Sequence, residues 1–78
     1  MTPLSLLKAK ECAQVQAIGG SGAIRQRLMD MGILPGAEMT VTRIAPTGDP
    51  FWIALAGSEL ALRRSEAETI LVARKTDV

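Results

Sequence analysis

Turn-forming residues interrupt the middle of this chain at short intervals. The stretches GGSG (19–22), LPGA (34–37), PTGDP (46–50) and GS (57–58) leave only short segments between residues 19 and 58. Most of these segments are rich in aliphatic and β-branched residues, which is typical of strands. Five short strands joined by tight turns within 78 residues predict a mainly β fold, a small and partly open barrel.

The composition restricts the chemistry that such a barrel can carry. A chain of 78 residues buries only about 60–65% of its unfolded surface, so it needs a dense core, a covalent staple or a partner. One cysteine, Cys12, allows no internal disulfide, and with no histidine the chain cannot supply the four N or S ligands of a structural zinc site. We interpret Cys12 as a small apolar residue of a protein in a reducing cytoplasm.

Charge and hydropathy exclude further classes of protein. Nine Lys and Arg residues against eight Asp and Glu give a net charge of +1, without the cationic excess of a nucleic-acid-binding surface. No apolar run approaches the roughly 18 residues of a membrane span. Residues 1–7 (MTPLSLL) lack the positive charge of a signal sequence. We therefore expect a cytoplasmic protein that binds no nucleic acid and does not insert into a membrane.

Hydrophobic periodicity places the elements along the chain. Ala13 and Val15 alternate with polar neighbours, as in a half-buried strand. Ile24, Leu28 and Met31 recur at helical spacing and form one apolar stripe. We predict strands over 11–18, 38–45, 51–56, 59–63 and 70–74, a helix over 22–31 between the first two strands, and a helical turn over 65–68 before the last.

Local signals set the ends of these elements. Ser21 is expected to cap the helix with its hydroxyl group. Gly32 stands where a left-handed residue would end that helix, and Ser65 and Glu68 have the spacing of a capping box. The leucines of the first segment are expected to close one end of the core: Leu4, Leu6 and Leu7.

Two further turns have clear sequence signals. Pro35 and Gly36 fit the two central positions of a type II turn, because proline fixes φ at the first and glycine tolerates a positive φ at the second. Gly57 and Ser58 form a Gly-X pair that suits a two-residue type II′ hairpin. A hairpin turn of fixed length also fixes how the two strands pair.

The strand 51–56 carries apolar residues on both faces. With a turn at 57–58, the register places Trp52 opposite Arg63 and Ala54 opposite Ala61 on the outer face. Arg63 would then make a cation–π contact with Trp52, worth about 0.5–1 kcal/mol when exposed. If the last strand lies beside this hairpin, the outer surface becomes an apolar strip: Trp52, Ala54, Ala61, Leu71 and Ala73.

Two interpretations of this strip remain open. In one, the leading segment or the helix covers it, and no function follows. In the other it is a docking surface, with Trp52 as the anchor, Arg63 beside it and Asp49 of the loop 46–50 at its edge. A docking surface of this kind would bind another protein or a second copy of the chain.

Three sequence blocks together resemble a known family. RLMDMGILPG (27–36), APTGDPF (45–51) and LALRRSEAETILV (60–72) occur in the order and at the spacings of the FeoA family, small cytoplasmic proteins of bacterial ferrous iron uptake. The resemblance covers about residues 4–72. It implies a single SH3-like domain over 1–78, a β-barrel with an inserted helical segment.

The resemblance also implies a function and partners. The protein would be a non-enzymatic accessory protein of FeoB, a membrane transporter with a cytoplasmic G-protein domain. The same barrel is a C-terminal module of iron-dependent repressors, but no winged-helix segment precedes it here, so the stand-alone form is expected. A self-assembling module and an iron-linked regulatory domain are the alternatives.

Most positions shared with the family are expected to be structural. Besides the turn at residues 35–36, Pro46, Gly48 and Pro50 shape the loop before the third strand. The sequence departs from the family at AKEC (9–12), where a glycine-containing turn is usual. It also departs at Trp52, where a smaller β-former is expected.

The types and spacing of the residues argue against a metal-binding or catalytic site. Ferrous iron sites use histidine together with carboxylates, and this chain has no histidine. Glu66 and Glu68 are two residues apart on a helical turn, so their side chains do not face each other. No nucleophile has a base near it in the sequence. We therefore expect no bound iron, no cofactor and no enzymatic activity.

Overall fold

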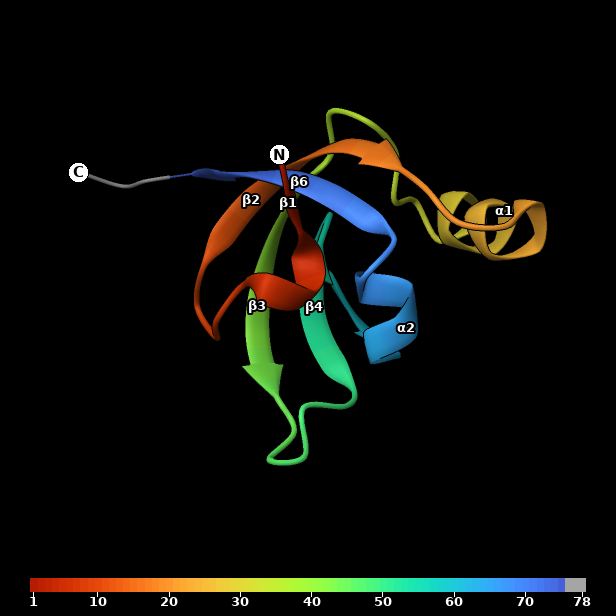
Figure 1. Cartoon of the computed structure of the whole chain (residues 1–78). Coiled ribbons are helices and arrows are strands. Elements are labelled where there is room, and N and C mark those ends of the chain that lie inside the picture. The colour runs from red at the N-terminus through yellow and green to blue at the C-terminus, as the bar shows by residue number, and fades with distance from the viewer. Residues whose placement is uncertain (76–78) are drawn as a thin grey trace.

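The structure, a computed structural model, describes residues 1–75. Figure 1 shows strands that curl around a common centre, with one helix standing out to the side and a shorter one at the end of the barrel. In chain order the elements are β1 (Thr2–Pro3), the 3-10 turn η1 (Leu4–Leu6), β2 (Cys12–Ile18), α1 (Gly22–Asp30), β3 (Glu38–Ile44), β4 (Phe51–Leu55), β5 (Ser58–Leu62), α2 (Arg64–Ala67) and β6 (Ile70–Lys75).

The strands form one antiparallel sheet in the order β1-β6-β2-β3-β4-β5. The short strand β1 pairs with β6, so the beginning and the end of the described chain lie side by side (Figure 1). The apolar strip was predicted on the condition that the last strand lies beside the hairpin, and this condition is not met. Helix α2 carries the chain away from β5, and β6 then pairs with β1 and β2 instead.

The interior of the barrel is aliphatic apart from Met39 and Phe51. Leu4 and Leu7 are buried and close one end of the core, as predicted, whereas Leu6 is 59% exposed. A fully buried leucine contributes about 1.5–3 kcal/mol relative to an exposed one. The buried apolar residues are Leu4, Leu7, Ala13, Val15, Leu28, Ile33, Met39, Val41, Phe51, Ile53, Leu55, Leu62, Ala67, Ile70 and Val72.

Helix α1 is attached to the barrel along a narrow stripe. Leu28 is its only fully buried residue, and Ile24 packs partly against the core. The helix ends one residue earlier than predicted, and Gly32 follows with a φ of 92°, the left-handed conformation expected after a helix. Ser21 is the N-cap residue, but its hydroxyl makes no capping hydrogen bond, so that part of the prediction is wrong.

The β4–β5 hairpin turns one residue earlier than predicted. Ala56 and Gly57 occupy the turn with φ values of 50° and 83°, and positive φ at both positions is the type I′ pattern rather than type II′. Trp52 therefore pairs with Ala61 instead of Arg63. Because the pairing moves by two residues, every side chain keeps its predicted face.

The remaining turns agree with the sequence prediction. Gly36 has a φ of 92°, and the Ala37 N–H donates to the Leu34 carbonyl at 2.9 Å, which closes the turn that Pro35 begins. In the next loop the Gly48 N–H donates to the Ala45 carbonyl at 2.7 Å. The peptide bond before Pro50 is cis.

Candidate interaction surface

Trp52 lies half-buried on the outer face of β4, where the sheet is lined by small side chains. Its neighbours across the strands are Ala61 on β5 and Arg43 on β3. Ala54 follows on the same face of β4, half-buried as well, and Ala61 is exposed. We call these four residues, Trp52, Ala54, Ala61 and Arg43, the Trp52 platform.

Arg43, and not Arg63, makes the cation–π contact. Its guanidinium carbon lies 4.1 Å from the centroid of the Trp52 ring. The pairing between β3 and β4 shifts between Val41 and Arg43, and this β-bulge brings Arg43 opposite Trp52. Bulges commonly redirect a side chain in this way. The contact covers part of the indole ring and holds a positive charge over it.

The bulged residue itself connects three strands. The Thr42 hydroxyl lies 2.8 Å from Oε2 of Glu59 on β5 and 3.1 Å from the carbonyl oxygen of Trp52 on β4. Both oxygens are acceptors, so the hydroxyl donates toward β4 or β5. Glu59 thereby places a negative charge at the border of the Trp52 platform. Arg43 is the one charged residue of the platform itself, and its charge is positive.

The predicted apolar strip does not form as one surface. Leu71 pairs with Pro3 of β1 and Ala17 of β2, and two strands, β2 and β3, separate β6 from β4. Leu71 and Ala73 are therefore on another part of the barrel. The leading segment does not cover the Trp52 platform, because β1 pairs with β6 and η1 packs near β6 and α2.

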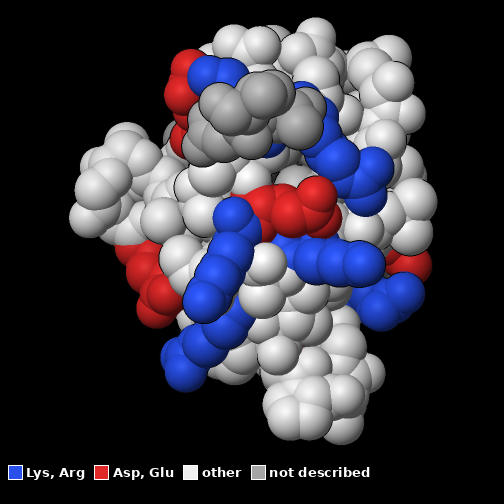
Figure 2. Space-filling view, turned by 90° about the vertical axis from the view of Figure 1, so that its left-hand side faces the viewer, with Lys and Arg blue, Asp and Glu red and all other residues white. Residues whose placement is uncertain are grey.

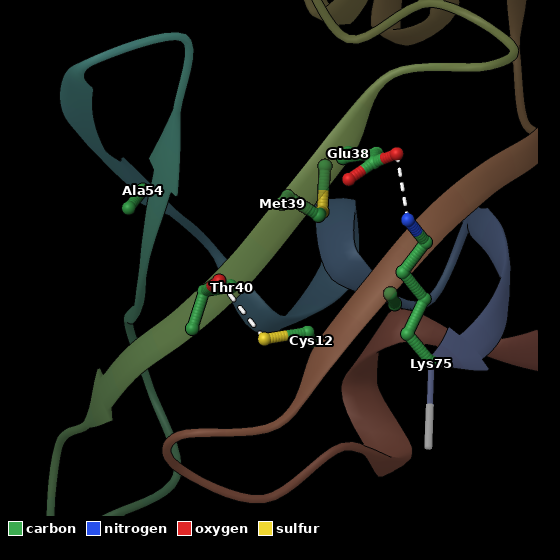
Figure 3. A pocket seen from close by; sticks show the side chains of 7 residues that line it. Cys12, Glu38, Met39, Thr40, Ala54 and Lys75 are labelled. Atoms are coloured by element: carbon green, nitrogen blue, oxygen red, sulfur yellow. Dashed lines mark hydrogen bonds and ion pairs between the residues drawn. The ribbon is translucent and has the colours of Figure 1, made fainter. Parts of the chain in front are cut away.

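A shallow hollow of about 300 Å³ lies next to the platform. Figure 3 shows its lining from β2, β3, β4 and β6, with Ala54 shared between the hollow and the platform. The Cys12 sulfur lies 3.3 Å from Oγ1 of Thr40, and the Lys75 ammonium contacts Oε2 of Glu38 at 2.6 Å. Cys12 is half-buried, and its thiol is within hydrogen-bond distance of a hydroxyl group rather than packed only against apolar groups.

Positive and negative side chains alternate on the face that Figure 2 shows. Lys and Arg side chains gather there around acidic ones. Two ion pairs join the end of β6 to its surroundings, Arg74 to Glu11 at 3.3 Å and Lys75 to Glu38 at 2.6 Å. These two pairs neutralise the charges of the last two described residues.

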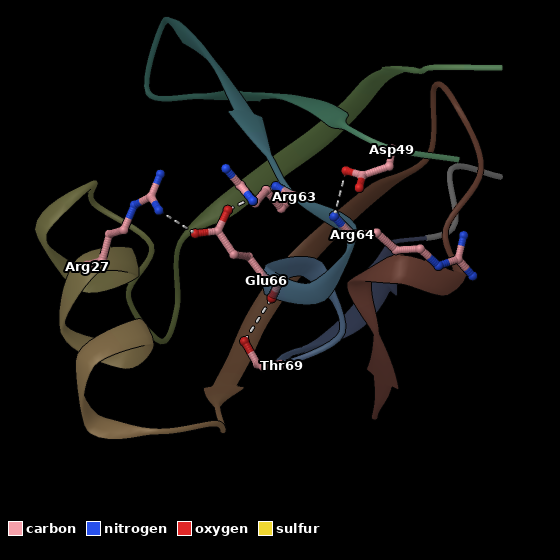
Figure 4. Close-up of polar contacts among 6 residues, drawn as sticks. All are labelled: Arg27, Asp49, Arg63, Arg64, Glu66 and Thr69. Carbon is pink, nitrogen blue, oxygen red and sulfur yellow. Dashed lines mark hydrogen bonds and ion pairs between the residues drawn. The ribbon is translucent and has the colours of Figure 1, made fainter. Parts of the chain in front are cut away.

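Helix α2 is held by two carboxylates (Figure 4). Asp49, expected at the edge of a docking surface, accepts a hydrogen bond from the Arg64 N–H at 3.0 Å and so ties the loop before β4 to the start of α2. Glu66 is 4% exposed. Its Oε1 accepts from the Arg63 N–H at 2.9 Å, and its Oε2 pairs with Arg27 of α1 at 3.2 Å.

Sequence reasoning missed both Glu66 and Arg43. The capping box was expected two residues later, at Ser65 and Glu68, but Arg63 is the N-cap residue and Glu66 the third helical one. A glutamate three residues after Arg63, the predicted end of the strand 59–63, was a usable signal for Glu66. For Arg43 we find no signal, because nothing in the sequence 38–45 marks a bulge.

Neither a metal cluster nor a membrane helix is found in the part of the chain that the structure describes. Within residues 1–75, no three His, Cys, Asp or Glu side chains come together as a group that could hold a metal ion. No helix in this range is long and apolar enough to cross a membrane. The Trp52 platform and the hollow beside it both lie within this range.

A family model and a curated relative both match this chain to the same family. The model of the FeoA domain matches residues 2–74. The Fe(2+) transport protein A/Fe(2+) transporter FeoB fusion protein of Porphyromonas gingivalis is 33% identical over 69 residues, which are 88% of this chain and 8% of that protein. The chain thus spans a small part of the length of this curated relative.

Solved structures of similar proteins share the fold. The FeoA-like protein of Clostridium acetobutylicum has a TM-score of 0.91 at 36% identity, with 99% of this chain and 90% of the other covered. The FeoA protein of Chlorobium tepidum has a TM-score of 0.89 at 43% identity, covering 96% and 71%. The zinc-complexed FeoA of Stenotrophomonas maltophilia, described as a procaryotic SH3 domain protein, has a TM-score of 0.80 at 31% identity, covering 94% and 89%.

More distant structures extend the likeness of fold alone. The T. acidophilum IdeR structure has a TM-score of 0.85 at 17% identity, and the manganese regulator SloR one of 0.83 at 14%. Together with the similar proteins above, they confirm the expected SH3-like β-barrel.

Proposed function

The chain belongs to the FeoA family, and from this premise we propose that it is a non-enzymatic accessory protein of bacterial ferrous iron uptake that binds the cytoplasmic part of a FeoB-type transporter. The observation that carries this proposal is the Porphyromonas gingivalis relative, in which Fe(2+) transport protein A and FeoB are one fusion protein. A short covalent connection raises the effective concentration of two modules to about the millimolar range. Two modules that bind each other weakly gain most from such a connection.

The Trp52 platform is the surface that we propose for this contact. Tryptophan and arginine are the residues that most often anchor protein interfaces. Here Arg43 holds the indole ring of Trp52 in place at 4.1 Å, so little side-chain freedom remains to be lost on binding. The small side chains of Ala54 and Ala61 leave the ring accessible to a flat partner surface.

A binding measurement with the purified transporter in detergent tests the proposal. We expect Trp52→Ala to weaken binding by about tenfold or more, the loss usual for an interface anchor. Arg25→Ala is the matched control, because Arg25 is exposed on α1 and lies on another element. The far-ultraviolet circular dichroism spectrum of both variants shows whether the barrel is intact.

Two outcomes would contradict the proposal. Absence of any binding by the wild-type chain would remove FeoB as the partner. Equal affinities of wild-type, Trp52→Ala and Arg25→Ala proteins would keep the partner but exclude the platform. Light scattering over a range of concentrations gives the oligomeric state of the free chain, and so tests self-assembly as the alternative use of this surface.

A further inference from the structure

Strand β5 is a free edge of the sheet. It is the last strand in the order β1-β6-β2-β3-β4-β5, and its one partner among residues 1–75 is β4. In an antiparallel pair, hydrogen-bonded and non-hydrogen-bonded residue pairs alternate from the turn outward. Leu55 and Ser58 close the two-residue turn, so Glu59 and Ala61 point their N–H and C=O groups away from β4.

These main-chain groups have no backbone hydrogen-bond partner among residues 1–75. None of the turn, loop and cap hydrogen bonds among residues 1–75 involves the N–H or C=O of Glu59 or Ala61. Both residues are exposed. An edge with two outward N–H groups and two outward C=O groups is a template for one further strand.

A second hollow lies along the inner side of the same edge. It has a volume of about 440 Å³ and lies between the hairpin and the end of α1. Met31 and Gly32 border it from the α1 side, and Leu55 and Leu60 from the hairpin. Leu60 is half-buried on β5 itself. An apolar side chain of an added strand would fall into this hollow, because alternate residues of a strand point to the same face.

The far end of β5 is cationic. Figure 4 shows the Arg63 side chain extending from the end of the strand toward the side where Arg27 of α1 lies. Arg27 pairs with Glu66, but its side chain is 62% exposed, and Arg63 uses its main-chain N–H, not its guanidinium, to contact Glu66. An acidic side chain at this end of the added strand would have arginine partners.

We propose that an extended segment of the FeoB-type transporter binds this chain by adding a strand to the β5 edge. The segment carries an apolar residue that fills the hollow beside Leu60 and an acidic residue that meets Arg63. The inference rests on the proposed function, and it deepens it by naming the chemistry of the contact. The β5 edge and the Trp52 platform are adjacent, since Ala61 belongs to both, so one partner covers both surfaces.

A proline substitution on the edge separates strand addition from other contacts. The Ala61 N–H points away from β4, so Ala61→Pro deletes an outward donor and leaves the β4–β5 hydrogen bonds in place. Ala61→Ser changes the side chain at the same position and keeps the N–H. We expect the affinity of the Ala61→Pro protein for detergent-solubilised transporter to be about tenfold lower than that of Ala61→Ser. Equal affinities of the two folded variants would overturn strand addition.

Hydrogen exchange on the wild-type chain provides a measurement that needs no variant. In the complex we expect the amide hydrogens of Glu59 and Ala61 to exchange at least about tenfold more slowly than in the free protein, because they become donors to the added strand. Unchanged exchange at both amides in a formed complex would overturn the proposal. Charge reversal at Arg63 is expected to weaken binding as well, and unchanged binding would remove the acidic residue from the proposed segment.

The proposed function and strand addition at the β5 edge would be contradicted by different results. If the wild-type chain does not bind the transporter at all, the proposed function fails and strand addition by FeoB fails with it. If it binds, but the Ala61 variants and the exchange rates show no difference, only strand addition is overturned. A dimer of the free chain that Ala61→Pro dissociates would identify a second copy as the occupant and would also overturn the proposal.

Discussion

Removal of the buried carboxylate at Glu66 is expected to destabilise the fold more than the loss of its arginine partner. Glu66 makes two interactions of different kinds. Its Oε1 accepts the Arg63 N–H at 2.9 Å, and its Oε2 lies 3.2 Å from Nη1 of Arg27. The side chain of Glu66 is 6% exposed, whereas that of Arg27 is 62% exposed. The hydrogen bond from the Arg63 N–H therefore goes to a buried carboxylate, whereas the ion pair involves a guanidinium group that is exposed to water.

The two contributions have different magnitudes. A hydrogen bond to a charged group contributes about 1.5–3 kcal/mol to the free energy of unfolding. An ion pair with an exposed partner contributes about 0.2–1 kcal/mol. We expect Glu66→Ala to lower the free energy of unfolding by about 2–4 kcal/mol. Glu66→Gln is expected to cost less, about 0.5–1.5 kcal/mol, because the amide oxygen still accepts from the Arg63 N–H.

Urea unfolding followed by the fluorescence of Trp52, the only tryptophan, measures these differences. The decisive comparison is with Arg27→Ala, for which we expect a loss of at most about 1 kcal/mol. If Arg27→Ala costs as much as Glu66→Ala, the ion pair is the dominant contact and the reasoning is refuted. A double-mutant cycle between the two residues gives the pair energy directly, and a coupling above about 2 kcal/mol would also contradict it.

Three further predictions concern other parts of the chain. Ala56→Asn is expected to raise the free energy of unfolding by about 0.5–1 kcal/mol, because asparagine tolerates the positive φ of a type I′ turn better than alanine; an unchanged urea midpoint would contradict this. Leu4→Ala is expected to lower it by about 2–5 kcal/mol, since the side chain is fully buried; a loss below 1 kcal/mol would show that the leading segment is not part of the core. Equilibrium dialysis is expected to detect no tightly held ferrous ion, because the chain has no histidine; one ion per chain would disprove this.

The sequence predicted the five longer strands and most of the side chains that face the core, but not the two-residue strand β1 (Thr2–Pro3). Gly32 and Gly36 mark their turns correctly, because both have a φ of 92°, which few residues other than glycine adopt, and Pro35 fixes φ at the position before Gly36. Alternation along the last strand placed Ile70 and Val72 inside, where they are buried. These signals are local, and a single sequence contains them in full.

Three features could not be predicted, because the local sequence either fits more than one arrangement or carries no signal for the one that forms. Gly57 fits either a type I′ or a type II′ turn, and the structure uses it as the second turn residue although alanine is a poor first one. The bulge that directs Arg43 over Trp52 has no sequence signal. The position of β6 depends on the path of α2, and a four-residue helix does not fix the direction of the chain after it.

The pairing of Thr2 with Val72 has a consequence for synthesis on the ribosome. The first residues of the chain cannot pair until the last strand has left the ribosome. The barrel therefore cannot close while residue 72 is still in the exit tunnel. Leu4 and Leu7, which the closed barrel buries, remain accessible to chaperones until then. A domain fused behind this chain would therefore begin to emerge only after the barrel has all the strands that it needs.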